Sequence, residues 1–250
     1  MPDQLSLQLT GDAPGLPTTL RPMLARVAAG PFDSPVHLFE PSWGGRRLLA
    51  FVEVAGGAPG AGPLLRLVDG RGRDIGDRLP ELQSLVELVV ERPAVLDGEL
   101  VVPDPGGRAD TAALSRRLRG PAGPGTETTP APPAVYLVFD LLYAGGRPLL
   151  GLPLERRRDL LARIVRPSPE VVLVPAVAGA GRDLHAAVVA QGLPGVLARH
   201  VRSPYLAGRR SGLWRRVDAA AREPEPEPAR AEAPARPVLA LLQRLPLDWG

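Results

Sequence analysis

The sequence predicts an α+β fold, in which short strands alternate with a few helices. Apolar residues gather in brief runs typical of strands, and four other segments repeat their apolar residues at helical spacing. Glycine and proline are abundant, at 28 and 31 residues, and they separate these runs. Aromatic residues make up only 4% of the chain, so leucine and valine must form most of the core.

The first half of the chain contains four expected strands and two expected helices. Apolar residues run densely from Val36 to Val54 and are interrupted by Gly44–Gly45, which is typical of two strands joined by a turn. A helix that starts near Leu79 should end before Pro93, and Asp110 stands where it would cap the next helix. The remaining elements of this half are strands over 64–68 and 95–102 and a helix over 111–118.

The second half begins with an exposed loop over 120–133, rich in glycine, proline and threonine. The nearly continuous apolar run 135–142 indicates a strand buried on both faces. An amphipathic helix follows over 154–165, and we expect Arg156, Arg157 and Arg158 on its solvent side. The last expected elements are strands over 171–174, 195–201 and 213–217 and a helix over 182–191.

A chain of 250 residues can contain one good-sized domain with tails. Residues 1–20 predict a loose N-terminal lead-in, and residues 21–218 a single domain. The composition changes after Asp218, which predicts a Pro/Ala/Glu-rich linker over 219–237 and a short terminal helix or tail over 238–250.

Several classes of protein are disfavoured by composition. The absence of cysteine excludes disulfides and thiolate metal sites, and no apolar run approaches the roughly 20 residues of a membrane span. No signal peptide is apparent, so we expect a cytoplasmic protein without membrane contact. The net charge is only +3, which is weak support for nucleic-acid binding. All 30 basic residues are arginine, because the chain contains no lysine.

The stretch from Phe39 to Arg47, F-E-P-S-W-G-G-R-R, is similar to the K-x-D-G-x-R signature of ATP-dependent DNA ligases. Further segments resemble, in the same order, the motifs of their nucleotidyltransferase domain, particularly the ligase module of bacterial end-joining proteins. The resemblance covers about 21–217. These segments are R-P-M-L-A at 21–25, R-L-P-E-L at 78–82, L-D-G-E-L at 96–100, F-D-L-L-Y at 139–143, G-V-L-A-R at 195–199, S-P-Y at 203–205, G-R-R-S at 208–211 and L-W-R-R-V at 213–217.

The resemblance implies a ligase-type nucleotidyltransferase fold, with two packed antiparallel sheets, flanking helices and a central groove. In this family an oligonucleotide-binding (OB) barrel follows the last motif. The residues after Val217 are too few for a five-stranded barrel, so none is expected here.

Departures from the family pattern fall on its chemistry. Ser42 stands at the place of the lysine nucleophile, and a serine hydroxyl would need an adjacent base to react. His37 lies five residues away, on the opposite face of an extended strand. Gly44 and Pro194 replace carboxylates, and Asp218 replaces a lysine.

The residues that remain predict a vestigial nucleotide site and a DNA-facing surface. Glu99 is a candidate ligand for ribose or a metal, or a carboxylate held by a neighbouring arginine, and no other metal ligand is expected. Phe139 is a candidate adenine platform or a plain core residue. The expected nucleotide-binding set is Arg47, Glu99, Phe139, Arg199 and Arg216. The expected DNA-phosphate set is Arg46, Arg209, Arg210 and Arg215, whose alternative is a solvated basic surface.

We therefore expect a degenerate, catalytically inactive ligase-like domain that binds DNA ends, a nucleotide or a DNA-repair protein. The alternatives are a working ATP-dependent DNA ligase in repair or recombination, and a structural interaction module. ATP or AMP, with Mg²⁺, would be the cofactors if the family activity survives.

Overall fold

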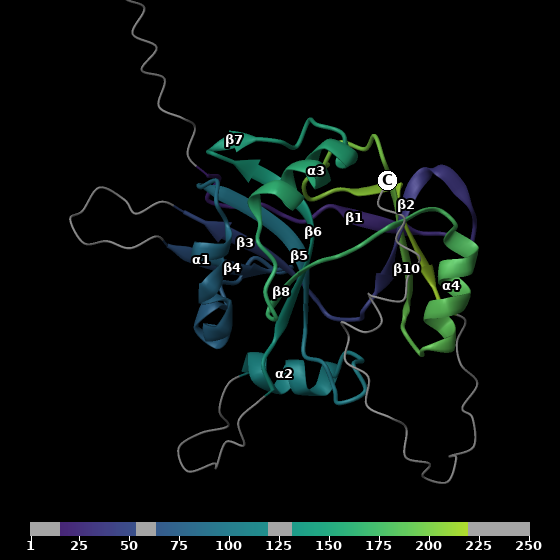
Figure 1. Cartoon of the computed structure of the whole chain (residues 1–250), viewed down its shortest axis with the longest axis horizontal. Coiled ribbons are helices and arrows are strands. Elements are labelled where there is room, and N and C mark those ends of the chain that lie inside the picture. Colours follow the sequence, from purple (N-terminus) through teal and green to yellow (C-terminus); the bar gives the residue numbers. More distant parts are fainter. Residues whose placement is uncertain (1–15, 54–63, 120–131, 220–250) are drawn as a thin grey trace, which may run out of the picture.

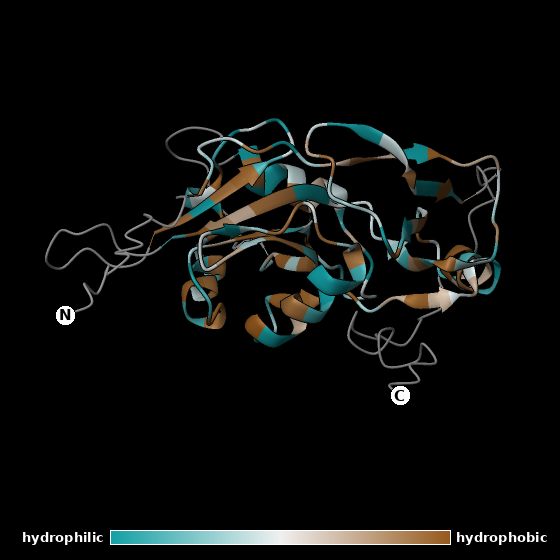
Figure 2. Cartoon of the chain, turned by 90° about the horizontal axis from the view of Figure 1, so that it is seen from above, coloured by the Kyte–Doolittle hydropathy of each residue, from teal (hydrophilic) through white to brown (hydrophobic). Residues whose placement is uncertain are grey.

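The computed structural model describes residues 16–53, 64–119 and 132–219. They form two β-sheets with helices on their outer faces (Figure 1). Figure 2 shows hydrophobic residues concentrated along the strands and on the helices that pack against them. None of the helices in this described part is long and apolar enough to cross a bilayer.

The five-stranded sheet has the order β1-β11-β10-β2-β9. Its strands are β1 (Leu24–Val27), β11 (Arg210–Asp218), β10 (Gly195–His200), β2 (Ser34–Ser42) and β9 (Val177–Gly179). Helix α4 (Gly181–Ala190) covers one face, where Leu184 and Val188 are buried. Strand β1 lies at an edge and runs parallel to β11, whereas the other pairs of this sheet are antiparallel.

The second sheet is six-stranded, with the order β4-β3-β5-β6-β7 and with β8 paired parallel to β6. Its strands are β4 (Leu65–Asp69), β3 (Arg46–Val52), β5 (Ala94–Val101), β6 (Val135–Ala144), β7 (Arg147–Pro148) and β8 (Val171–Leu173). The helical elements of this half are η1 (Gly76–Arg78), η2 (Pro80–Ser84), α1 (Leu85–Leu88), α2 (Thr111–Arg119) and α3 (Leu154–Ile164).

The turn 43–45 carries the chain from one sheet to the other. Strands β2 and β3, expected as neighbours joined by a turn, therefore belong to different sheets. Gly44 has a φ of 74°, a conformation that favours glycine, and a Cβ on Gly45 would lie 2.2 Å from the Leu100 carbonyl oxygen. The glycine pair thus lets the chain cross between closely packed layers.

Side chains along each strand alternate between the two faces of the sheet, and this alternation produces two apolar clusters. Residues on one face of the six-stranded sheet pack against the short helices, and those on the other face meet the five-stranded sheet. Leu48 and Leu96 represent the first cluster, and Leu49 and Phe139 the second. Any site between the sheets is therefore bounded by a closely packed core.

Most expected elements are present, and three expectations were wrong. The helix expected from Leu79 is instead one 3₁₀ segment, η2, followed by the single α-turn α1, because Leu79 itself has non-helical dihedrals (φ −132°, ψ 55°) and the 3₁₀ segment begins only at Pro80. The sheets are mixed, since β1–β11 and β6–β8 are parallel. Strands β1, β7 and β9 were not predicted, being only two to four residues long.

Asp110 does cap α2, since its carboxylate accepts the amide of Ala113 at 2.8 Å. Other expectations lie outside the described residues. They concern most of the lead-in over 1–20 and the loop over 120–133, the linker over 219–237, the tail over 238–250, and with these the absence of an OB barrel.

Candidate functional site

The facing surfaces of the two sheets bring four of the retained residues together. The guanidinium carbon of Arg199, on β10, lies 3.9 Å from the ring centroid of Phe139 and 4.8 Å from that of Trp214. Arg47, on β3, lies 4.7 Å and 5.6 Å from the same two centroids. We call Arg47, Phe139, Arg199 and Trp214 the arginine–aromatic cluster. Cation–π contacts of this kind contribute about 0.5–2 kcal/mol each.

Arg47 is held by a buried carboxylate. Its Nε and Nη2 atoms each donate to Asp97 at 2.5 Å, and the Tyr205 hydroxyl donates to the same carboxylate at 2.7 Å. Burial by itself would lower the pKa of Arg47. The charge and hydrogen bonds of Asp97 outweigh this effect, so the pKa of Arg47 is raised above its ordinary value. Arg47 is therefore a fixed, permanently charged wall of the cluster.

Arg199 is fully buried and shares one carboxylate with a second arginine. Its Nη1 atom pairs with Glu40 of β2, and Glu40 also accepts from Arg158 of α3. No hydrogen-bond partner for the Nε and Nη2 atoms of Arg199 occurs in the described ranges. Burial lowers the pKa of Arg199 to about 9 and that of Arg158 to about 10, while Tyr205 opposes the shift of Arg199 and Asp140 opposes that of Arg158. Both side chains thus remain charged at neutral pH, with one carboxylate between them.

This arrangement fills the expected adenine platform. Phe139 is only 4% exposed, and Arg199 lies over its ring within van der Waals distance. Arg199 was expected to meet phosphates, and in the structure its guanidinium lies over the ring of Phe139, the expected adenine platform. The residues present therefore do not fit ATP in the manner that the resemblance implies.

Arg157 and Arg158 correct an expectation about α3. Arg157 is fully buried and donates to Asp140 at 2.8 Å and 2.7 Å, and Arg158 turns toward Glu40, so only Arg156 lies on the solvent side. The amphipathic pattern could not show this, because a buried arginine looks solvent-facing until its carboxylate partner is known.

Glu99 stabilises the crossing between the sheets. Its carboxylate accepts the amide of Gly45 at 2.6 Å and that of Trp43 at 3.4 Å. Burial raises the pKa of Glu99, although these two hydrogen bonds oppose the shift. Among the residues that the structure describes, no group of three or more His, Asp or Glu side chains could hold a metal ion. Glu99 thus serves as a cap for the turn 43–45, with both oxygens engaged.

Ser42 lies at the end of β2, directly before this turn, in register with Gly195 of β10. Within the described part of the chain, its hydroxyl has no hydrogen-bond partner that could act as a base. His37 lies five residues before Ser42, on the opposite face of β2. It pairs with His200 across the strands, and its Nδ1 atom lies 2.8 Å from the Ser34 hydroxyl. Burial, His200 and Arg215 lower the pKa of His37, but its imidazole does not approach Ser42.

The departures at Gly44 and Pro194 face each other. A Cβ on Gly44 would lie 2.9 Å from Cγ of Pro194, closer than side chains pack. At the two positions where the resemblance implies carboxylates, the ring of Pro194 therefore packs directly against the backbone of Gly44.

The remaining predicted residues are dispersed. Arg216 forms an exposed ion pair with Asp218, at 2.6 Å between Nε and Oδ1, which neutralises the charge expected for a phosphate. Arg46 lies on β3 next to Arg47 and so projects from the opposite face of its sheet. The other three, Arg209, Arg210 and Arg215, are exposed on or beside β11.

Sequence reasoning missed Glu40, Asp97, Arg158 and Tyr205. A signal was present, because Glu40 and Asp97 stand inside apolar strands where a carboxylate is rarely buried without a partner. The partners come from distant segments, so their identity needed the fold.

Comparisons with known proteins agree with this architecture. The family model described as "ATP dependent DNA ligase domain" matches residues 37–217. The chain belongs to this family. Its ligase-like domain is 35% identical over 199 residues to LigD of Mycobacterium tuberculosis strain H37Rv, a "multifunctional non-homologous end joining DNA repair protein", covering 78% of this chain and 23% of the relative.

A second relative is DNA ligase C1 of Mycolicibacterium smegmatis, 34% identical over 205 residues, with coverage of 76% of this chain and 54% of the relative. The solved ligase domain of M. tuberculosis LigD has a TM-score of 0.64 and 28% identity, over 80% of this chain and 59% of that chain. A structure of mycobacterial DNA ligase D complexed with ATP and MES has a TM-score of 0.63 at 29% identity, over 80% of this chain and 60% of that chain. The chain thus spans about a quarter to a half of these curated relatives. The comparisons confirm the expected ligase-type fold.

Proposed function

We propose that this ligase-like domain is catalytically inactive and contacts DNA through its exposed arginines. The observation that carries the proposal is the position of Arg199, whose guanidinium covers Phe139 and is held there by Glu40. An adenine ring would have to displace a buried charge from its carboxylate, which costs several kcal/mol.

The nucleophile position supports the same conclusion. A guanidinium cannot replace a lysine amine as a nucleophile, and the chain contains no lysine that could carry AMP. Ser42 is a weak nucleophile without a base in the described residues. Pro194 adds no carboxylate for a metal, and Glu99 is engaged by backbone amides.

DNA contact is supported by the arginines that have no carboxylate partner in the described structure, among them Arg209, Arg210 and Arg215. Binding of this kind should be weak, independent of sequence and steeply dependent on salt, because phosphate contacts act through counterion release. The name of the LigD relative suggests a role in end joining, where an inactive domain would hold DNA ends or a repair protein in the cytoplasm.

Incubation with labelled ATP and Mg²⁺, followed by denaturing electrophoresis, tests the proposal. We expect no labelled band, because the chain has no lysine ε-amine to carry AMP as a phosphoramidate. A covalent adduct that maps to Ser42 would overturn the proposal and favour the working ligase.

A further inference from the structure

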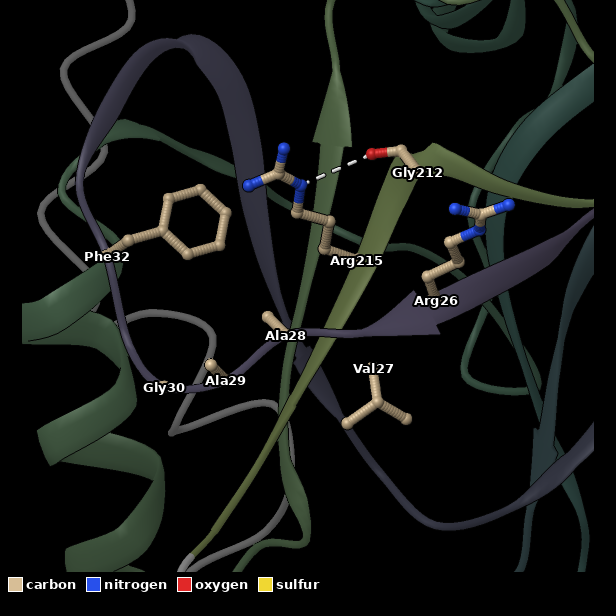
Figure 3. Close-up of a pocket in the computed structure, with 8 residues that line it drawn as sticks. All are labelled: Arg26, Val27, Ala28, Ala29, Gly30, Phe32, Gly212 and Arg215. Carbon is tan, nitrogen blue, oxygen red and sulfur yellow. Dashed lines mark hydrogen bonds between the residues drawn. The ribbon is translucent and has the colours of Figure 1, made fainter.

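A pocket of about 410 Å³ opens on the five-stranded sheet between β1 and β11. One wall is the stretch 26–30, which ends β1 and continues beyond it, together with Phe32. The other wall is formed by Gly212 and Arg215 of β11 (Figure 3). The pairing register skips from Ala25–Ser211 to Arg26–Arg215, so β11 bulges away from β1 at this point. The bulge gives the pocket its room.

This pocket is separate from the arginine–aromatic cluster. Trp214 pairs with Arg199, whereas Arg215 pairs with Ala198. Successive residues of a strand point to opposite faces, so Arg215 projects away from the face that carries Trp214 and Arg199. The side chain of Arg215 instead lies beside Phe32, with 5.3 Å between its guanidinium carbon and the ring centroid.

Two arginines, Arg26 and Arg215, line the pocket, and neither has a carboxylate partner among the described residues. Arg26 and Arg215 are direct partners across the parallel pair, and both flank Gly212. The Nε of Arg215 donates to the Gly212 carbonyl at 3.2 Å, and Cδ of Arg26 lies 3.9 Å from the position of a Cβ on Gly212. No acidic side chain of the described residues pairs with either. Like charges at opposed positions are unfavourable until an anion neutralises them.

The nearest acids in sequence are engaged elsewhere. Asp33, next to Phe32, accepts the backbone amide of Arg182 at 2.9 Å and lies 3.7 Å from its Nε. Asp218 pairs with Arg216. The pocket is therefore positive, and Figure 3 shows the guanidinium of Arg215 between Phe32 and Gly212.

We propose that the Arg26–Arg215 pocket is a phosphate site for the backbone of a DNA strand. Two guanidinium forks match the oxygens of a phosphate, and the volume lies in the range of small-ligand sites. Arg209 and Arg210 continue the positive charge along β11, and the six residues from Arg210 to Arg215 would span roughly 16 Å if fully extended. A row of this length suits successive phosphates of one strand better than a single free phosphate.

That the phosphate belongs to DNA rests on the DNA contact proposed above, whereas the position of the site rests on the pocket itself. The test compares the full chain with an Arg26→Gln/Arg215→Gln variant and with a matched control, Arg163→Gln/Arg166→Gln. The control removes the same charge from exposed positions at and beyond the end of α3. Anisotropy of a labelled duplex is measured between about 50 and about 200 mM salt.

We expect the pocket variant to bind DNA roughly tenfold or more weakly at about 50 mM salt, with a salt slope flatter by about one unit, because the contact with one phosphate is lost. The control should change both quantities much less. If the wild type binds DNA and the pocket variant behaves like the control, the pocket proposal is wrong while DNA contact by the domain stands.

A second measurement separates the site from the source of the phosphate. The Nε–Hε signal of Arg215 is followed by NMR while inorganic phosphate alone or duplex DNA is added. Shifts with both ligands support the proposal. If the wild type binds no DNA at low salt, both the proposed DNA contact and the proposal that the pocket holds a DNA phosphate are wrong. If inorganic phosphate causes no shift, the pocket is not a phosphate site.

Discussion

Replacing Glu40 by glutamine should destabilise the domain far more than replacing Arg199 by methionine. Glu40 is the carboxylate shared by Arg158 and Arg199, all three being largely buried. Glu40→Gln leaves two buried guanidiniums without a counter-charge, a change that costs about 3–5 kcal/mol. Arg199→Met keeps the length of the side chain and leaves Glu40 with Arg158 alone.

The loss in Arg199→Met is the cation–π contact with two rings, about 0.5–2 kcal/mol for each. Against this, the substitution removes a buried charge and two nitrogen atoms without hydrogen-bond partners, which relieves about 1–3 kcal/mol for each unsatisfied group. We therefore expect the free energy of unfolding to stay within about 1.5 kcal/mol of the wild type, as for volume-conserving core substitutions.

Urea unfolding followed by tryptophan fluorescence measures both changes, with the slope of each transition as a check on two-state behaviour. The Glu40→Gln/Arg199→Met double variant should recover part of the loss caused by Glu40→Gln, since only Arg158 then lacks its paired carboxylate. Equal losses in the two single variants, or a larger loss in Arg199→Met, would refute the account of the shared carboxylate.

The remaining predictions concern the crossing between the sheets. Burial raises the folded-state pKa of Glu99, so protonation of Glu99 favours the folded protein. Compared with Glu99→Gln, the wild type should gain stability as pH falls from that raised pKa toward the ordinary value of 4.5. If the urea midpoints of the two proteins move in parallel between pH 7 and pH 4.5, this prediction is contradicted. Gly44→Asp should cost about 1–3 kcal/mol, because the backbone has φ 74° and Pro194 blocks the Cβ. Pro194→Ala should relieve part of that cost, and additive losses in the double variant would show that the two positions are independent. Ser42→Lys alone should not seal nicked duplex DNA, and ligation by that variant would show that the other departures are harmless.

Much of the fold was predictable because the apolar runs and glycine turns are local signals. The strand at 135–142 and the Asp110 cap are examples, confirmed by β6 and by the Ala113 amide. The partition of the strands into two sheets was not predictable from these signals, since the same Gly44–Gly45 pattern serves a hairpin or a crossing. It came from the resemblance, which the family match and the solved ligase domain confirm.

The candidate site was predictable in its members but not in their arrangement. Arg47 and Phe139, both in the expected set, lie together, and Trp214, which was not in that set, joins them. The direction taken by Arg199 depends on Glu40, which belongs to another strand, and no spacing rule connects the two. The pocket beside Arg215 depends on a bulge between two strands nearly two hundred residues apart.

Calorimetry with Mg-ATP, ADP and AMP tests most directly whether Arg199 has closed the adenine site. We expect affinities no tighter than about the millimolar range, about −4 kcal/mol, with AMP or ADP preferred over Mg-ATP, because the described residues contain no cluster of acidic side chains to hold a metal beside the triphosphate. Micromolar binding of Mg-ATP that is lost in Phe139→Ala would contradict the account and restore the domain as an enzyme.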